Sequence, residues 1–239
     1  MKILAVDSSG LVASIALVED DQMIAEYTVN YKKTHSQTLV PMLDEIKKMI
    51  DLDLASLDAI AVVKGPGSFT GLRIGSATVK GLGLALNKPI ISVPTVDALS
   101  YNVCDTNKLV CPIMDARREQ VYTGLYRFEN GEHIVVKEQC AIAVNELCDI
   151  INDMGEEVLF LGDGVPVYKE HIDAALKVAH SYAPAHMARQ RAGALAELAK
   201  KYYVQGIMES AAAHRPDYLR LSQAERERLE AEREAEKQK

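Results

Sequence analysis

Residues 60–86, IAVVKGPGSFTGLRIGSATVKGLGLAL, contain the most informative pattern in this 239-residue chain. A short apolar strand leads into a loop with three glycines and then into a helix that carries three more, Gly75, Gly81 and Gly83. Each glycine inside a helix costs roughly 1 kcal/mol relative to alanine. A chain that accepts this cost repeatedly is expected to have its backbone approached closely, either by a ligand at the loop or by a second helix against the glycine face.

The residues before this stretch alternate between apolar strands and tight turns. Strand patterns at 2–6, 12–18 and 23–31 predict an antiparallel meander. A helix with one apolar face follows at 36–50. Residues 1–103 therefore predict the order βββαβαβα, which forms one mixed sheet with helices on both faces.

The second half of the chain begins in the same way. Residues 109–114 form an expected strand that ends on an aspartate, and two strands joined by an Asn130-Gly131 turn follow it. This repetition indicates an internal duplication. We expect an α/β fold with a lobe at 1–103, a smaller lobe at 104–221 and a charged helical or disordered tail at 222–239.

Composition narrows the function classes. The net charge is −7, and an acidic chain is a poor stand-alone binder of nucleic acid because phosphate contacts come from clustered Lys and Arg. The first residues lack a signal-peptide pattern, and no run approaches the roughly 20 apolar residues of a membrane span. Four cysteines without metal-binding spacing indicate free thiols. We expect a cytoplasmic protein that makes no membrane contact.

Four segments together carry a resemblance to a known family. They are ILAVDSS at 3–9, HSQTLVPML at 35–43, GPGSFTGLRIG at 65–75 and PDYLR at 216–220. The two expected lobes resemble the ribonuclease-H-like lobes of the actin, sugar-kinase and Hsp70 superfamily. Within it, residues 1–221 resemble the TsaB (YeaZ) family, bacterial tRNA threonylcarbamoyladenosine biosynthesis proteins.

The resemblance implies a role in modifying adenosine 37 of tRNA. In that pathway another enzyme makes threonylcarbamoyl-adenylate, the paralogue TsaD transfers the group to tRNA with a metal ion, and the ATPase TsaE assists. TsaB is the non-catalytic partner of TsaD and a homodimer when TsaD is absent. The chain is thus expected to be a scaffold or activator subunit without catalytic residues, which meets tRNA only through the complex.

The first candidate for metal chemistry is His35. In TsaD a His-x-x-x-His pair on the corresponding helix binds the metal, because residues four apart lie on one helix face. Here the second position is Leu39. We therefore expect His35 to be a capping or surface residue, with no metal site. A metalloprotease and a TsaD-like transferase are both disfavoured.

A competing hypothesis is an ATPase or kinase of the actin-like superfamily that uses Asp7 and the cleft between the lobes. The second lobe of such kinases supplies an Asp-x-Gly turn, whereas this chain has Asp115-Ala116-Arg117, with a side chain where a phosphate must approach the backbone. Both aspartates can instead satisfy backbone donors of their turns, and Ser68 can cap a helix. Two alternatives are kept: binding of ATP or ADP with magnesium at a subunit junction, and binding of an anion at the glycine loop. The candidate contacts are Asp7, Ser8, Gly65, Gly67, Ser68, Asp115 and Gly162.

The two helices at 36–50 and 72–86 supply the expected docking surface. The second is apolar nearly all round, so it must be covered on all sides, whereas its own sheet covers one. Either the lobe encloses it, or, as we favour, both helices pair with those of a second copy or of TsaD. On that interpretation Gly75→Leu or Leu43→Asp breaks association and leaves the monomer folded. The expected interface residues are Leu39, Leu43, Ile46, Ile50, Leu72, Gly75, Val79 and Leu82.

Overall fold

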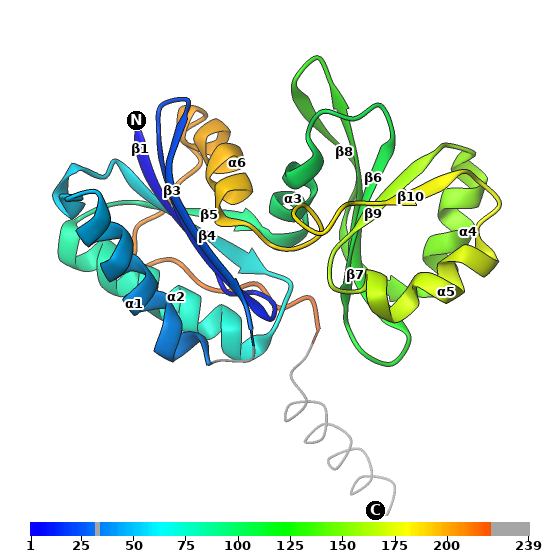
Figure 1. Ribbon diagram of the computed structural model, residues 1–239, viewed down its shortest axis with the longest axis horizontal. Coiled ribbons are helices and arrows are strands. Elements are labelled where there is room, and N and C mark those ends of the chain that lie inside the picture. Colours follow the sequence, from blue (N-terminus) through cyan, green and yellow to red (C-terminus); the bar gives the residue numbers. More distant parts are fainter. Residues whose placement is uncertain (32–33, 221–239) are drawn as a thin grey trace, which may run out of the picture.

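The computed structural model describes residues 1–31 and 34–220, which form two lobes side by side (Figure 1). The expected tail at 222–239 lies outside the described residues. The first lobe contains β1 (Lys2–Asp7), β2 (Val12–Glu19), β3 (Gln22–Asn30), α1 (His35–Met49), β4 (Ala59–Gly65), α2 (Phe69–Leu86), β5 (Ile90–Pro94) and α3 (Thr95–Ser100). The rest of the chain contains β6 (Leu109–Asp115), β7 (Gln120–Glu129), β8 (Glu132–Ala143), α4 (Val144–Met154), β9 (Val158–Leu161), α5 (Val165–Ala175), β10 (His180–Tyr182) and α6 (Ala192–Val204).

The two sheets repeat one topology. Their strand orders are β3-β2-β1-β4-β5 and β8-β7-β6-β9-β10, so each lobe has an antiparallel meander followed by two parallel strands. The parallel strands are joined through helices, as right-handed crossovers require. The predicted α/β fold with two ribonuclease-H-like lobes is confirmed.

Both faces of the first sheet are covered by helices. Side chains alternate along β1, so Ile3 and Ala5 pack against α6, whereas Leu4 and Val6 pack toward α1 and α2. Figure 1 shows α1 and α2 next to each other on one face and α6 on the other. The core of this lobe therefore lies in two layers, one on each side of the sheet.

The expected boundary between the lobes is wrong for the last part of the chain. Residues 104–221 were expected to form the second lobe, but α6 packs on the first sheet, where Leu195 and Leu198 join the core around Ile3. The physical reason is that α3, with six residues, is too short to cover that apolar face. Its uncovered part is buried by a helix that returns from the second lobe.

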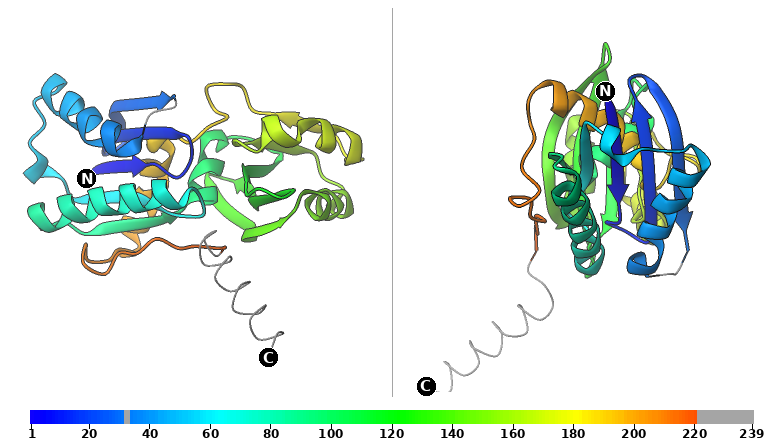
Figure 2. Two further views of the ribbon diagram at one scale, coloured as in Figure 1. Left: turned by 90° about the horizontal axis from the view of Figure 1, so that it is seen from below. Right: turned by 90° about the vertical axis from the view of Figure 1, so that its left-hand side faces the viewer.

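The segment after α6, residues 205–220, also belongs to the first lobe, and we call it the C-terminal strap. It runs along α2 in the direction opposite to the helix (Figure 2). Glu209 exchanges two backbone hydrogen bonds with Ile90, of 2.8 and 2.9 Å. The Lys80 ammonium donates to the carbonyl oxygen of His214 at 2.9 Å. The Tyr218 ring stacks on Phe69 with centroids 4.6 Å apart.

The lobes meet through α3, which packs on β6 and β7. Asp97 of this helix is buried, and its carboxylate accepts a hydrogen bond of 2.6 Å from the Tyr126 hydroxyl. Burial raises the pKa of Asp97 to about 6, against an ordinary value near 4. The charged carboxylate is therefore less favourable in the folded protein than in the unfolded chain.

Asp97→Asn is expected to make the protein more stable at neutral pH. Because the folded-state pKa is raised, the stability of the parent protein falls as pH rises from about 4 to about 6, by about 3 kcal/mol from this group. Asparagine keeps an acceptor for Tyr126 and does not ionise. Urea denaturation at pH 4, 5, 6 and 7 should show this loss for the parent and a flatter profile for the variant. Parallel profiles for the two proteins would contradict the expectation.

Among the helices of residues 1–31 and 34–220, none combines the length and the apolar character that a membrane crossing requires. The four cysteines are free thiols, as the sequence predicted. Cys111 and Cys148 are buried, and burial raises the pKa of Cys111 to about 12, so this thiol stays protonated.

Candidate functional site

The turn between β1 and β2 rests on the glycine loop and the first turn of α2. The Ser68 amide donates to the Ser9 carbonyl at 2.6 Å, and the Ser8 hydroxyl donates to the Gly71 carbonyl at 2.9 Å. A Cβ on Gly67 would lie 2.4 Å from the Ser9 oxygen, and one on Gly71 would lie 2.0 Å from the Ser8 oxygen. No side chain fits at such distances, so the backbone that approaches these glycines belongs to the same chain.

The seven candidates for nucleotide or anion contact fall into two groups. Gly67, Ser68 and Asp115 line a cleft between the lobes. Ser68 also caps α2 by accepting from the Gly71 amide at 3.3 Å, as predicted. The other four make contacts within the chain and do not line the cleft; they are Asp7, Ser8, Gly65 and Gly162.

Asp7 is the clearest correction to the nucleotide hypothesis. Its side chain is buried at 2% exposure, and one carboxylate oxygen accepts from the Ser9 amide at 2.9 Å and from the Ser9 hydroxyl at 2.7 Å. Burial raises the pKa of Asp7. Gly65 and Gly162 are likewise explained by contacts within the chain. A Cβ on Gly65 would lie 2.1 Å from the Asp217 carbonyl oxygen, and a Cβ on Gly162 would lie 2.1 Å from the Ile113 carbonyl oxygen.

The cleft between the lobes has a volume of about 650 Å³. Its first wall is formed by the β1–β2 turn and by the beginnings of α1 and α2. Its second wall is formed by the end of β6 and the turn that follows, and Arg220 of the strap lies at its edge. The lining side chains and glycines include Ser9, Gly10, Thr34, His35, Phe69, Thr70, Ile74, Met114, Asp115, Arg117, Tyr122 and Asp163.

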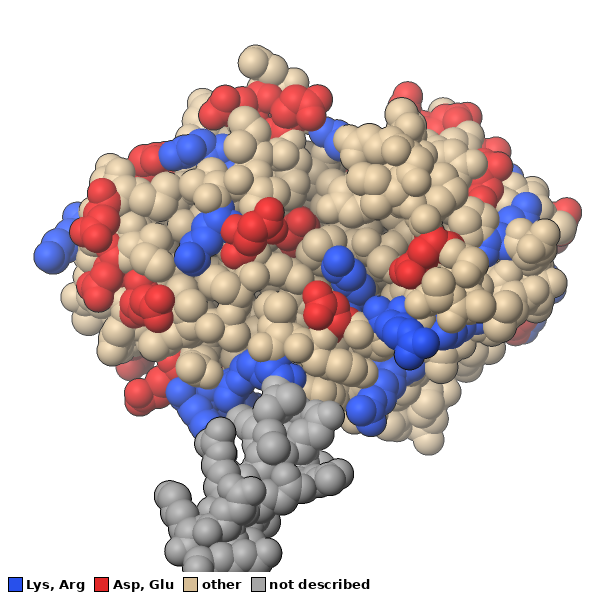
Figure 3. All heavy atoms as spheres, turned by 180° about the vertical axis from the view of Figure 1, so that it is seen from behind, with Lys and Arg blue, Asp and Glu red and all other residues tan. Residues whose placement is uncertain are grey.

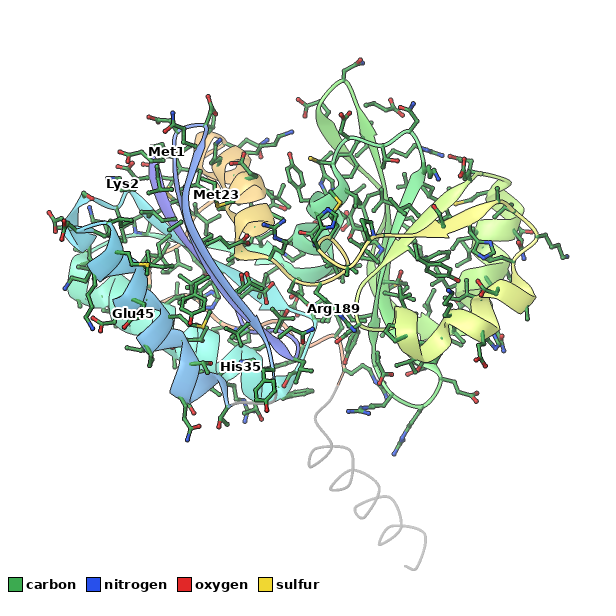
Figure 4. The ribbon with its side chains drawn as sticks, viewed as in Figure 1. Met1, Lys2, Met23, His35, Glu45 and Arg189 are labelled. Carbon is green, nitrogen blue, oxygen red and sulfur yellow. The ribbon has the colours of Figure 1, made fainter. Side chains whose placement is uncertain are left out.

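His35 has a structural role at the start of α1. Its Nε2 donates to the Gly10 carbonyl at 2.8 Å, which ties the helix to the β1–β2 turn. The structure described for residues 1–31 and 34–220 contains no group of three His, Cys, Asp or Glu side chains placed to hold a metal ion. Figure 4 shows His35 at the start of α1 and Arg189 on the segment that passes between the lobes.

The second wall of the cleft holds two carboxylates. Asp115 accepts from the Arg117 amide at 2.8 Å and from the Tyr168 hydroxyl at 3.0 Å. Asp163 accepts from the Asp115 amide at 3.2 Å, and burial raises its pKa. Asp115 thus satisfies donors of its own turn, as the sequence suggested, and still faces the cleft.

Sequence reasoning missed several cleft residues. Phe69, Tyr122 and Arg220 come from three separate segments, so no local spacing connects them. For Arg220 a signal existed, because it ends the PDYLR motif. Its guanidinium donates to the Ala116 carbonyl, which joins the strap to the second lobe.

The expected docking residues face the core of their own lobe and not its surface. Six of the eight are buried within their own lobe, namely Leu39, Leu43, Ile46, Leu72, Gly75 and Val79; Ile50 and Leu82 are half-buried against the same core. The reason is that the apolar stripe of α1 covers the sheet. For α2, the sheet, α1 and the strap each cover one side.

One stripe of α2 is left exposed. It contains Ala77, Gly81, Leu84 and Ala85, and the Leu84 side chain is 63% exposed. On α1, Val40 is 58% exposed. We call these five residues the α1–α2 face. A Cβ added at Gly81 would meet no atom within 4 Å, so nothing in the described chain explains this glycine.

The architecture defines a class, the two-lobed ribonuclease-H-like proteins. ROK hexokinase from Thermus thermophilus shares the fold, with a TM-score of 0.51 at 9% identity over 86% of this chain and 99% of the hexokinase. A family model described as TsaD: tRNA N6-adenosine threonylcarbamoyltransferase matches residues 22–228. TsaB from Bacillus subtilis, described as a tRNA threonylcarbamoyladenosine biosynthesis protein, is 36% identical over 98% of this chain and 100% of its own length. The chain belongs to the TsaB family.

Other relatives agree with this assignment. TsaB from Haemophilus influenzae is 28% identical over 92% of this chain and 94% of its own length. The solved structure of YeaZ from Pseudomonas aeruginosa has a TM-score of 0.76 at 26% identity and covers 91% of this chain and 100% of that one. The resemblance found in the sequence is confirmed, and the chain has a role in tRNA threonylcarbamoyladenosine biosynthesis.

Proposed function

We propose that this chain is a non-catalytic scaffold and activator subunit in the cytoplasmic complex that modifies adenosine 37 of tRNA, with a TsaD transferase as its partner and TsaE as a further component. The α1–α2 face forms the contact with the transferase, and it forms a homodimer when the transferase is absent. The observation that carries the proposal is Gly81, a glycine in the middle of an exposed helix with open space around it. Such a residue costs stability in the isolated chain and permits close approach of another helix.

The α1–α2 face has the composition that helix–helix docking requires. Ala77, Gly81 and Leu84 follow one another at four and three residues, which places them along one side of α2. Small residues let two helix backbones approach, and Leu84 and Val40 add apolar area. A surface of this kind supports pairing with the equivalent helices of a related subunit.

The competing ATPase or kinase hypothesis has less support. It needs an acidic side chain at the first hairpin that reaches a magnesium ion in the cleft. The Asp7 carboxylate is buried and bonded to Ser9, and the glycine loop occupies the space beside the β1–β2 turn. Catalysis by the partner subunit therefore explains these residues more simply than catalysis by this chain.

Substitutions at Gly81 test the proposal. Gly81→Ala is expected to stabilise the isolated monomer by about 0.5–1 kcal/mol, because the helix gains propensity and no atom is displaced. Gly81→Glu is expected to weaken association with the transferase at least about tenfold, since a long charged side chain stands where the helices must meet. Light scattering and co-purification with TsaD measure association, and a reconstituted tRNA modification assay measures activation.

The matched control is Ala174→Glu, at an exposed position of α5 in the second lobe. It adds the same side chain far from the α1–α2 face and should leave association unchanged. Full association of the Gly81→Glu variant, or full tRNA modification when this chain is omitted, would refute the scaffold assignment.

A further inference from the structure

Four arginines from three distant segments lie in or beside the interlobe cleft, and two of them, Arg117 and Arg220, line it. Arg73 belongs to α2, Arg117 and Arg118 to the β6–β7 turn, and Arg220 to the strap; we call them the arginine rim. Arg220 donates to the carbonyl oxygen of Ala116, directly beside Arg117, and Arg73 donates to the hydroxyl of Tyr218 at 3.2 Å. Figure 3 shows Lys and Arg side chains over both lobes in the lower part of this face. This local basic region contrasts with the net charge of −7.

The turn that carries two of these arginines has an unfavourable backbone. Arg117, Arg118 and Glu119 are in the left-handed region, with φ of 65°, 56° and 57°. Glycine or asparagine tolerates that region better than a long side chain does. The Arg117 side chain is 87% exposed, and its guanidinium forms an ion pair of 3.6 Å with the Asp115 carboxylate, so the turn presents this guanidinium at the edge of the cleft. Backbone strain retained together with exposed charge is typical of a binding segment.

The cleft behind the rim has a different chemistry. Phe69, Ile74, Met114 and Tyr122 give it apolar and aromatic walls, whereas Asp115 and Asp163 make its second wall acidic. A phosphate group inside the cleft would be repelled by these carboxylates, but a phosphate at the rim would meet guanidinium groups. A ligand that suits both regions has a flat ring to place inside and anionic groups to leave outside.

These features together fit single-stranded nucleic acid better than an acidic peptide. Unstacked bases bind against aromatic rings and arginine planes, and their phosphates bind arginine. A volume of about 650 Å³ is sufficient for one nucleotide base with its sugar, and four arginines exceed what one phosphate needs. The acidic composition limits binding by the chain as a whole, but a local rim can add to the RNA contacts of a complex.

We propose that the mouth of the interlobe cleft is a contact site for single-stranded RNA, with backbone phosphates on the arginine rim and one unstacked base in the cleft, an assignment that rests on the proposed function because it takes this RNA to be the loop of the tRNA substrate. The site lies beside the α1–α2 face, since Thr70 and Ile74 of α2 line the cleft. A transferase docked on that face would therefore have the RNA contact next to it.

The test uses the full chain and a fluorescein-labelled stem–loop RNA that carries the anticodon loop, with binding followed by fluorescence anisotropy. Arg117→Gly/Arg118→Gly is expected to weaken binding about tenfold or more at about 50 mM salt, and to reduce the salt slope by about 1.4, or 0.7 for each lost phosphate contact. Its melting temperature should be unchanged or higher, because glycine suits the left-handed backbone. A purely structural turn would not lose RNA binding while keeping its stability.

Lys169→Ala/Lys177→Ala is the matched control. It removes the same two charges from exposed positions of the second lobe and should change RNA binding less than about twofold. A fully paired duplex RNA is the second probe and should bind at least about tenfold more weakly than the stem–loop. Equal binding of duplex and stem–loop, or parent-like binding by the rim variant, would overturn the RNA site.

Association with TsaD separates this outcome from a failure of the proposed function. A rim variant that still pairs with the transferase but loses RNA binding supports both assignments. If a rim variant pairs normally with TsaD and also binds RNA as the parent does, the RNA site is refuted and the scaffold assignment is kept. The scaffold assignment is instead refuted if the Gly81→Glu variant associates with TsaD as the parent protein does.

Discussion

Replacing Gly75 with leucine is expected to lower the free energy of unfolding by about 3 kcal/mol or more, or to prevent folding. A Cβ at this position would lie 2.4 Å from the Ser8 hydroxyl oxygen, and that hydroxyl donates to the Gly71 carbonyl. A leucine side chain would push the β1–β2 turn off α2 and break the hydrogen bond. Urea denaturation followed by circular dichroism measures the loss.

Gly81→Leu is the control for this experiment, because it makes the same substitution on the same helix. No atom lies within 4 Å of a Cβ at Gly81, so the isolated monomer should keep its stability within about 1 kcal/mol. The two variants separate packing inside the lobe from docking on its surface. Equal stability of the two would show that Ser8 does not restrict Gly75.

Leu43→Asp is expected to cost about 4 kcal/mol or more. Leu43 is 6% exposed and packs with Leu39 and Ile46 against the first sheet, so the substitution removes core contacts and buries a charge. The aspartate would stay protonated or would expose the core to water, and either outcome destabilises the lobe. Thermal denaturation and urea titration of the purified variant measure the effect.

Val40→Asp is the matched change three residues earlier. Val40 is 58% exposed, so its replacement should cost less than about 0.5 kcal/mol in the monomer and should instead weaken association through the α1–α2 face. A Leu43→Asp variant that remains as stable as the Val40→Asp variant would contradict the buried position of Leu43. The interpretation of Gly75 and Leu43 as surface residues, made from sequence, predicted the reverse.

Local patterns in the chain predicted most of the secondary structure. Alternating and continuous apolar runs placed eight of the first nine strands close to their observed bounds. The exception is β8, which was predicted to end at residue 136 and continues to Ala143, and β10, with three residues, was too short to give a signal. The spacing of Leu39, Leu43 and Ile46 correctly identified one face of α1. It did not show what covers that face, because a helix stripe packs equally well on a sheet of its own lobe or on another subunit.

For the glycine-rich helix α2 as well, the sequence did not show which segments cover it. Its composition correctly predicted that its backbone is approached closely, but the approaching segment is the β1–β2 turn and not a ligand or a second helix. The approaching residues, Ser8 and Ser9, lie about sixty positions earlier in the chain, and the strap that covers another side lies more than a hundred positions later. The cleft residues likewise come from separate segments, so only their meeting in space identifies them as one site.

The amino-acid order alone was sufficient for most of the strands, the helices, the two-lobed class and the family, because each depends on periodicity or on motifs within a few tens of residues. The return of α6 and the strap to the first lobe, the burial of the expected docking residues and the gathering of four arginines at the cleft depended on the tertiary structure. These features arise from contacts between residues far apart in the chain, and such contacts are selected by which apolar surface remains uncovered after the local elements have formed.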